Sequence, residues 1–133
     1  MQYDDFVGQV QHRARLASTD EAVRAIRSTL AVFGRRLHGG QAEHLASQLP
    51  KEIAEYLPTD SEGDAFSMQE FLEKVAAEEE VDLPVSVHHT RAVLSVLQDA
   101  VTEGEMRDVR GQLPQDWQPL FEAGSEGDLE KEG

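Results

Sequence analysis

The chain of 133 residues contains no cysteine, and no apolar run approaches the roughly 20 residues that a membrane-spanning helix needs. Without cysteine there is no disulfide framework, thiolate metal site or cysteine nucleophile. The first residues, Met1–Asp5, lack the basic start and the apolar stretch of a signal peptide. We therefore expect a cytoplasmic protein that does not contact a membrane.

Enzyme motifs are also missing from the sequence. It has no glycine-rich phosphate loop, no Gly-x-Ser-x-Gly elbow and no His-Glu-x-x-His. The histidines do not have the four-residue spacing that places two imidazoles on one helical face. We therefore expect no enzyme, no cofactor and no metal site, and we expect the histidines to be solvated or to cap helices. They are His12, His38, His44, His88 and His89.

Positive charge is scarce, because the chain has 12 Lys and Arg residues and 26 Asp and Glu residues, which gives a net charge of −14. Residues 1–57 are neutral, and residues 58–133 carry the whole deficit. A field of that sign repels nucleic acid and anionic lipid and favours a basic partner. Adaptation to a salt-rich cytoplasm explains the acidity equally well. The sequence leaves open whether the acidity is a binding surface or a solvent adaptation.

What the chain does contain is a repeat. Gln48–Pro50 returns as Gln112–Pro114, a shift of 64, and Phe6 falls on Phe71 at a shift of 65. A lone unit of about 60 residues buries too little surface to be very stable, so we expect two copies that share one core. The predicted organisation is residues 1–57 as the first repeat, 58–65 as an acidic polar linker, 66–121 as the second repeat and 122–133 as a disordered acidic tail.

Apolar residues recur at helical spacing in both copies. The first stripe is Tyr3, Phe6, Val10, Arg13 and Leu16, and its counterpart is Met68, Phe71, Val75, Glu78 and Val81. A second stripe is Val23, Ile26, Leu30, Phe33 and Leu37, matched by Val87, Thr90, Leu94, Leu97 and Val101. We predict that these second helices are the most buried. A shorter helix then runs to each Gln-Leu-Pro, and a fourth begins at the proline, with Ile53 and Trp117 as core residues.

Helix starts and breaks support this division. Ser18 with Glu21, Ser67 with Glu70, and Thr102 with Glu105 have the spacing of capping boxes. Asp82 before Pro84 is the signature of an N-cap followed by a first-turn proline. Gly34 is expected to interrupt the second helix and to mark a close helix approach. The fold class predicted is all-α, with two tandem four-helix units packed as one bundle about an approximate internal two-fold.

The residues resemble a known prokaryotic family. The Asp4–Phe6 and Gln69–Phe71 openings, the apolar second helices, the glycine-rich breaks and the doubled Gln-Leu-Pro resemble the domain of unknown function 2267. The resemblance covers about residues 1–121. It implies an all-helical fold with paired repeats, and it brings no activity or functional residue with it.

Two groups of charged residues are candidates for binding a partner. One is the acidic run at the end of a helix, and the other is a set of arginines on the first two helices. The alternative interpretation of the arginines is ordinary surface charge that pairs with Asp and Glu. The residues are Arg13, Arg24, Arg27, Arg35, Arg36, Glu78, Glu79 and Glu80. The function that we expect is a non-catalytic interaction or regulatory module that binds another protein, and a monomer is favoured over a weak dimer. The alternatives are a DNA-associated helix-turn-helix-like protein and a metal-assisted enzyme.

Overall fold

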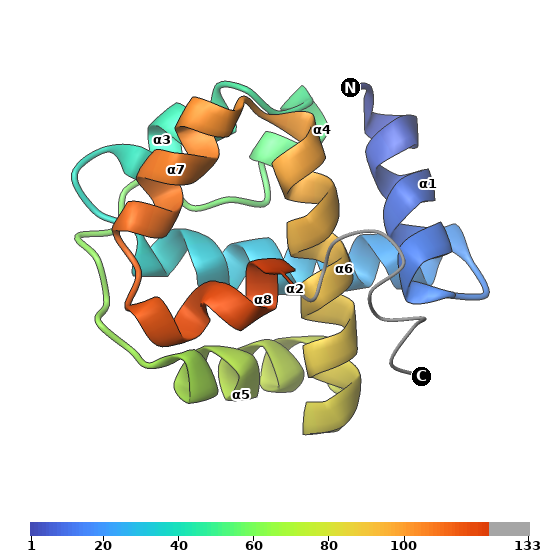
Figure 1. Ribbon diagram of the computed structural model, residues 1–133. Coiled ribbons are helices and arrows are strands. Elements are labelled where there is room, and N and C mark those ends of the chain that lie inside the picture. Colours follow the sequence, from blue (N-terminus) through green and yellow to red (C-terminus); the bar gives the residue numbers. More distant parts are fainter. Residues whose placement is uncertain (123–133) are drawn as a thin grey trace.

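The computed structural model describes residues 1–122, which form helices and no strand (Figure 1). The first repeat contains α1 (Tyr3–Ala14), α2 (Thr19–Arg36), α3 (Gln41–Ala46) and α4 (Lys51–Ala54). The second contains α5 (Met68–Glu79), α6 (Leu83–Ala100), α7 (Glu103–Gly111), the 3-10 helix η1 (Gln115–Trp117) and α8 (Gln118–Glu122). The all-α prediction is confirmed. Glu122 ends a helix rather than opening the predicted tail, and the remainder of that tail lies outside the described residues.

The two repeats present their helices in the same order, and the first two helices of each have equal lengths. Helices α1 and α5 each have 12 residues, and α2 and α6 each have 18. The match is poorest at the end of each unit, where the single turn of α4 corresponds to η1 followed by α8.

The first helix of each repeat packs on the second helices of both repeats. Helix α1 packs on α2 of its own repeat and on α6 of the other, while α5 packs on α6 and on α2 (Figure 1). Aromatic contacts join the two copies: the ring centroid of Phe33 lies 5.9 Å from that of Phe71 and 6.4 Å from that of Phe121. The single core expected from the length of one repeat is therefore present.

The glutamine of each Gln-Leu-Pro motif accepts a backbone hydrogen bond from the other repeat, and Gln112 also donates from its Nε2 to the His38 carbonyl at 3.0 Å. The backbone N–H of Thr102 donates to Oε1 of Gln48 at 2.9 Å, and that of His38 donates to Oε1 of Gln112 at 3.0 Å. His38 and Thr102 are themselves equivalent at the shift of 64. Besides ending a helix, each motif therefore holds the start of the other repeat's third helix.

The second helix of each repeat is the most buried, as predicted. Leu30 in α2 and Leu94 in α6 are fully buried, as are Ile26, Phe33 and Leu97. Ile53 and Trp117 also lie in the core, as expected from their equivalent places.

Not every predicted cap forms. Ser67 and Glu70 make a complete capping box, and the Ser18 side chain accepts from the Glu21 N–H. Asp82 occupies the N-cap position of α6, but its side chain makes no capping hydrogen bond. Thr102 caps α7, yet the Glu105 carboxylate turns away to accept from Gln41 and to contact His44. That carboxylate joins α7 to α3 instead of closing its own box.

Gly34 does not interrupt α2, which continues to Arg36. A Cβ at this position would lie 2.7 Å from both Cδ and the carbonyl oxygen of Pro58. The close approach predicted from the glycine is therefore real, but the neighbour is the connecting segment rather than another helix. The same segment is anchored where the Asp64 N–H donates to the Arg35 carbonyl at 2.8 Å.

Candidate functional site: the cleft between α2 and α5

The arginines that are candidates for binding a partner are spread over different contacts. Arg36 is buried, donates to the Phe66 carbonyl at 2.9 Å and lies 5.3 Å from the centre of the Trp117 ring. Arg13 reaches across to α6, and Arg35 is exposed on α2. Only Arg24 and Arg27 remain together, one turn apart on the exposed side of α2. Arg13 and Arg36 therefore make contacts within the fold, and the five arginines do not form one continuous surface.

The acidic run is also divided. Glu78 and Glu80 are exposed, but Glu79 is 2% exposed and its Oε2 lies 2.5 Å from Nδ1 of His89. Glu79 points inward because it follows Phe71 and Val75 at four-residue intervals on the buried face of α5. It therefore belongs to the core and not to a partner-binding patch.

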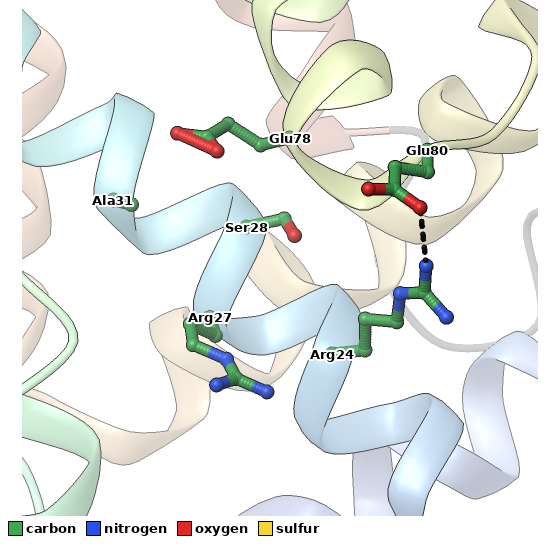
Figure 2. A pocket seen from close by; sticks show the side chains of 6 residues that line it. All are labelled: Arg24, Arg27, Ser28, Ala31, Glu78 and Glu80. Carbon is green, nitrogen blue, oxygen red and sulfur yellow. Dashed lines mark hydrogen bonds and ion pairs between the residues drawn. The ribbon is translucent and has the colours of Figure 1, made fainter.

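Four of the five remaining candidates line one cleft, and Arg35 lies outside it. Arg24 and Arg27 stand on α2, and Glu78 and Glu80 stand at the end of α5 (Figure 2). Ser28 and Ala31 also line the hollow, whose volume is about 450 Å³. Sequence reasoning selected all four charged residues, although it placed them in separate surfaces.

A left-handed residue positions one side of this cleft. Glu80 has φ of 63° at the C-cap of α5, and its repeat equivalent Arg15 has φ of 57° at the C-cap of α1. A residue with a side chain pays a conformational penalty in that region. The left-handed turn directs the Glu80 side chain toward α2, where its Oε1 lies 3.3 Å from the Arg24 guanidinium. Both side chains are more than half exposed, so this ion pair contributes little stability.

The other two charges of the cleft have no opposite charge within reach. Neither Arg27 nor Glu78 forms an ion pair with any residue of the described chain. The Arg27 guanidinium lies 6.0 Å from the centre of the Tyr56 ring. Tyr56 in turn neighbours Tyr3, whose pKa is raised mainly by burial and then by Tyr56. The cleft thus holds a cation and an anion that are both open to an outside partner.

A family profile described as an uncharacterized conserved protein, DUF2267, matches residues 3–120. The chain belongs to the DUF2267 family. No curated protein matches the chain. The match extends from α1 into α8 and so covers nearly all of the described residues.

The equivalent contact in this DUF2267 chain, between α1 and α6, is closed. Arg13 takes the place of Glu78, and its guanidinium lies 2.6 Å from both Ser95 Oγ and Asp99 Oδ2. The positions equivalent to Ser95 and Asp99 are Ala31 and Arg35. Ala31 has no hydroxyl group, and Arg35 forms no ion pair with Glu78. The α2–α5 contact is therefore open, whereas the equivalent α1–α6 contact is closed by the hydrogen bonds of Arg13.

The histidines fall into three environments. His12, His38 and His44 are exposed, as predicted, and His88 meets the Ala14 carbonyl at the end of α1 through Nε2, at 3.0 Å. His89 is neither solvated nor a cap, because it is buried against Glu79. Within residues 1–122, no three His, Asp or Glu side chains are grouped closely enough to hold a metal ion.

Sequence reasoning missed the Glu79–His89 pair, although the repeat contains a signal for it. The equivalent positions in the first repeat are Ala14 and Ala25, and both are buried. Two small buried residues in one copy thus indicate that the equivalent positions of the other copy are also buried, even when polar residues occupy them.

None of the described helices is long and apolar enough to cross a membrane.

Proposed function

We propose that this DUF2267 chain is a non-catalytic module that binds another protein through the α2–α5 cleft. The observation that supports the proposal most directly is the open pair of Arg27 and Glu78 in a cleft whose repeat counterpart is closed. A partner with a carboxylate for Arg27 and an amine or guanidinium for Glu78 would satisfy both. Such complementary charges contribute mainly to the rate and the specificity of association.

The character of the cleft favours a protein over a small ligand. It is lined by exposed charged side chains around Ser28 and Ala31, and no large apolar side chain lines it. Small-molecule sites are instead mostly apolar, with a few polar groups that fix orientation.

We also propose that the repeats, residues 1–57 and 66–121, are related by an approximate internal two-fold, with residues 58–65 joining them. The reciprocal bonds of Gln48 and Gln112 support this relation, as does the side-chain bond of 2.7 Å between the equivalent residues Gln41 and Glu105. On this view, the cleft and the closed α1–α6 contact are two versions of one arrangement. We propose a monomer in the cytoplasm as the form that meets the partner.

The test is affinity purification at the salt concentration of the native cytoplasm, with two variants of equal net charge. The double variant Arg27→Glu with Glu78→Arg exchanges the charges of the cleft, and Glu103→Arg with Arg107→Glu exchanges an exposed pair on α7. We expect the first exchange to remove a partner that the wild type and the second exchange both retain. The same set of bound proteins for all three chains would overturn the proposal.

A further inference from the structure

A second hollow lies where α7 ends and where η1 and α8 follow. Its volume is about 260 Å³, and both the second Gln-Leu-Pro turn and the aromatic rings of α8 and η1 contribute to it. Leu113, Trp117 and Phe121 supply its apolar surface, and Arg110 supplies a positive charge. The hollow is small, so it suits a compact ligand rather than one of drug size.

The repeats differ in chemistry at this position. Trp117 stands where the first repeat has Ile53, Phe121 where it has Leu57, and Arg110 where it has Ala46. Two aliphatic side chains and a methyl group are thus replaced by two aromatic rings and a guanidinium. Packing alone does not require these changes, because Ile53 and Leu57 are buried equally well in the first copy.

Trp117 has an unused hydrogen-bond donor. The residue is 1% exposed, and its Nε1 has no hydrogen-bond partner among residues 1–122. Phe71 stacks on the indole, with ring centroids 5.0 Å apart, and the Arg36 guanidinium lies over it. These contacts leave the N–H as the part of the ring with unmet capacity, and a buried donor without an acceptor is destabilising. A ligand that brings an acceptor would relieve that cost.

Arg110 has an unused charge beside the same rings. Its guanidinium lies 5.9 Å from the centre of the Phe121 ring and forms no ion pair within the described chain. A guanidinium at the edge of an apolar hollow is suited to a planar carboxylate, which it can bind through two parallel hydrogen bonds.

We propose that this hollow binds a small aromatic acid that carries a second hydrogen-bond acceptor. The carboxylate meets Arg110 and the planar ring lies against Leu113 and the edges of the aromatic side chains. Because the Trp117 N–H is buried, the indole shifts on binding so that the second acceptor can receive it. The inference is independent of the protein-binding cleft between α2 and α5, because the two hollows share no residue.

The probe is 4-hydroxybenzoate, added to the full-length protein labelled with nitrogen-15. Because Trp117 is the one tryptophan, the indole region of the NMR spectrum contains a single side-chain signal that reports on the site directly. We expect that signal and the amides of residues 110–121 to shift saturably at millimolar ligand. The uncharged 4-hydroxybenzamide should bind about tenfold more weakly, because it lacks the charge that Arg110 recognises.

Two variants and one control locate the binding. Arg110→Gln should weaken 4-hydroxybenzoate about tenfold, while Arg107→Gln removes an equal charge from α7 outside the hollow and should leave binding unchanged. Gly111→Leu should abolish binding by filling the hollow, and its Cβ would meet no atom within 4 Å, so the fold should survive. No saturable shift, equal binding of the amide, or equal losses from Arg107→Gln and Arg110→Gln would each overturn the proposal.

Discussion

Glu79 and His89 form a buried polar pair between α5 and α6, with Oε2 of the carboxylate 2.5 Å from Nδ1 of the imidazole. The second carboxylate oxygen is buried and has no hydrogen-bond partner among the described residues. In the first repeat the same two places hold Ala14 and Ala25. The same pair of core positions thus holds two alanines in one repeat and a carboxylate with an imidazole in the other. Only the polar pair depends on both of its members being present.

Removing one member of the Glu79–His89 pair should lower the stability of the fold. We expect Glu79→Ala to lower the free energy of unfolding by about 3 kcal/mol, because it strands the buried imidazole. Glu79→Ala with His89→Ala should lose less than the sum of the single changes, because it reproduces the alanine pair of the first repeat. Urea denaturation of the four chains gives the coupling energy. Strictly additive losses would show that the two side chains do not support each other.

The equivalent residues Arg13 and Glu78 should respond very differently to truncation. Arg13→Ala removes the charged hydrogen bonds to Ser95 and Asp99, so we expect a loss of about 1.5–3 kcal/mol in the free energy of unfolding. Glu78→Ala should stay within about 0.5 kcal/mol of wild type, since Glu78 is exposed and makes no ion pair in the described chain. Chemical denaturation measures both. A comparable loss from Glu78→Ala would mean that the α2–α5 cleft is closed in solution.

The reciprocal glutamines allow a test of the internal two-fold. Gln48→Ala removes one bond to the backbone of the other repeat and should cost about 1 kcal/mol, whereas Gln112→Ala removes two bonds to His38 and should cost about 2 kcal/mol. Thermal and urea unfolding should show a measurable loss of stability for both variants, with the larger loss for Gln112→Ala. A large loss from one and none from the other would show that the repeats are not equivalent at this contact.

The sequence predicted the helices well because both copies repeat the same apolar spacing, and burial follows spacing directly. Leu30 and Leu94 are the clearest cases. The side-chain contacts could not be predicted from the sequence as well, because they depend on which helices pack against each other. Nothing local to Glu105 shows that it will leave its capping box for Gln41, and nothing local to Arg36 shows that it will be buried beside Trp117. The cleft itself required α2 and α5 to be neighbours, which periodicity does not specify.

The DNA-associated alternative predicts binding through the arginines of the first half. The structure leaves little for such binding, because Arg13 and Arg36 are held within the fold and Arg24 pairs with Glu80. We expect no gel shift with duplex DNA at micromolar protein and low salt, where electrostatic attraction is strongest. A shift that Arg27→Glu or Arg35→Glu abolishes would revive the alternative.

The last prediction concerns assembly. Pairing between the neutral first half of one molecule and the acidic second half of another would favour a salt-sensitive dimer. Within one molecule, however, the halves already pair through Arg13 with Asp99 and through Arg24 with Glu80. Two chains of −14 also repel each other over their whole surfaces. We therefore expect sedimentation to give the mass of a single chain across a salt series. Dissociation on adding salt would instead indicate complementary pairing between molecules, and association would indicate an apolar interface that the net charge keeps apart at low salt.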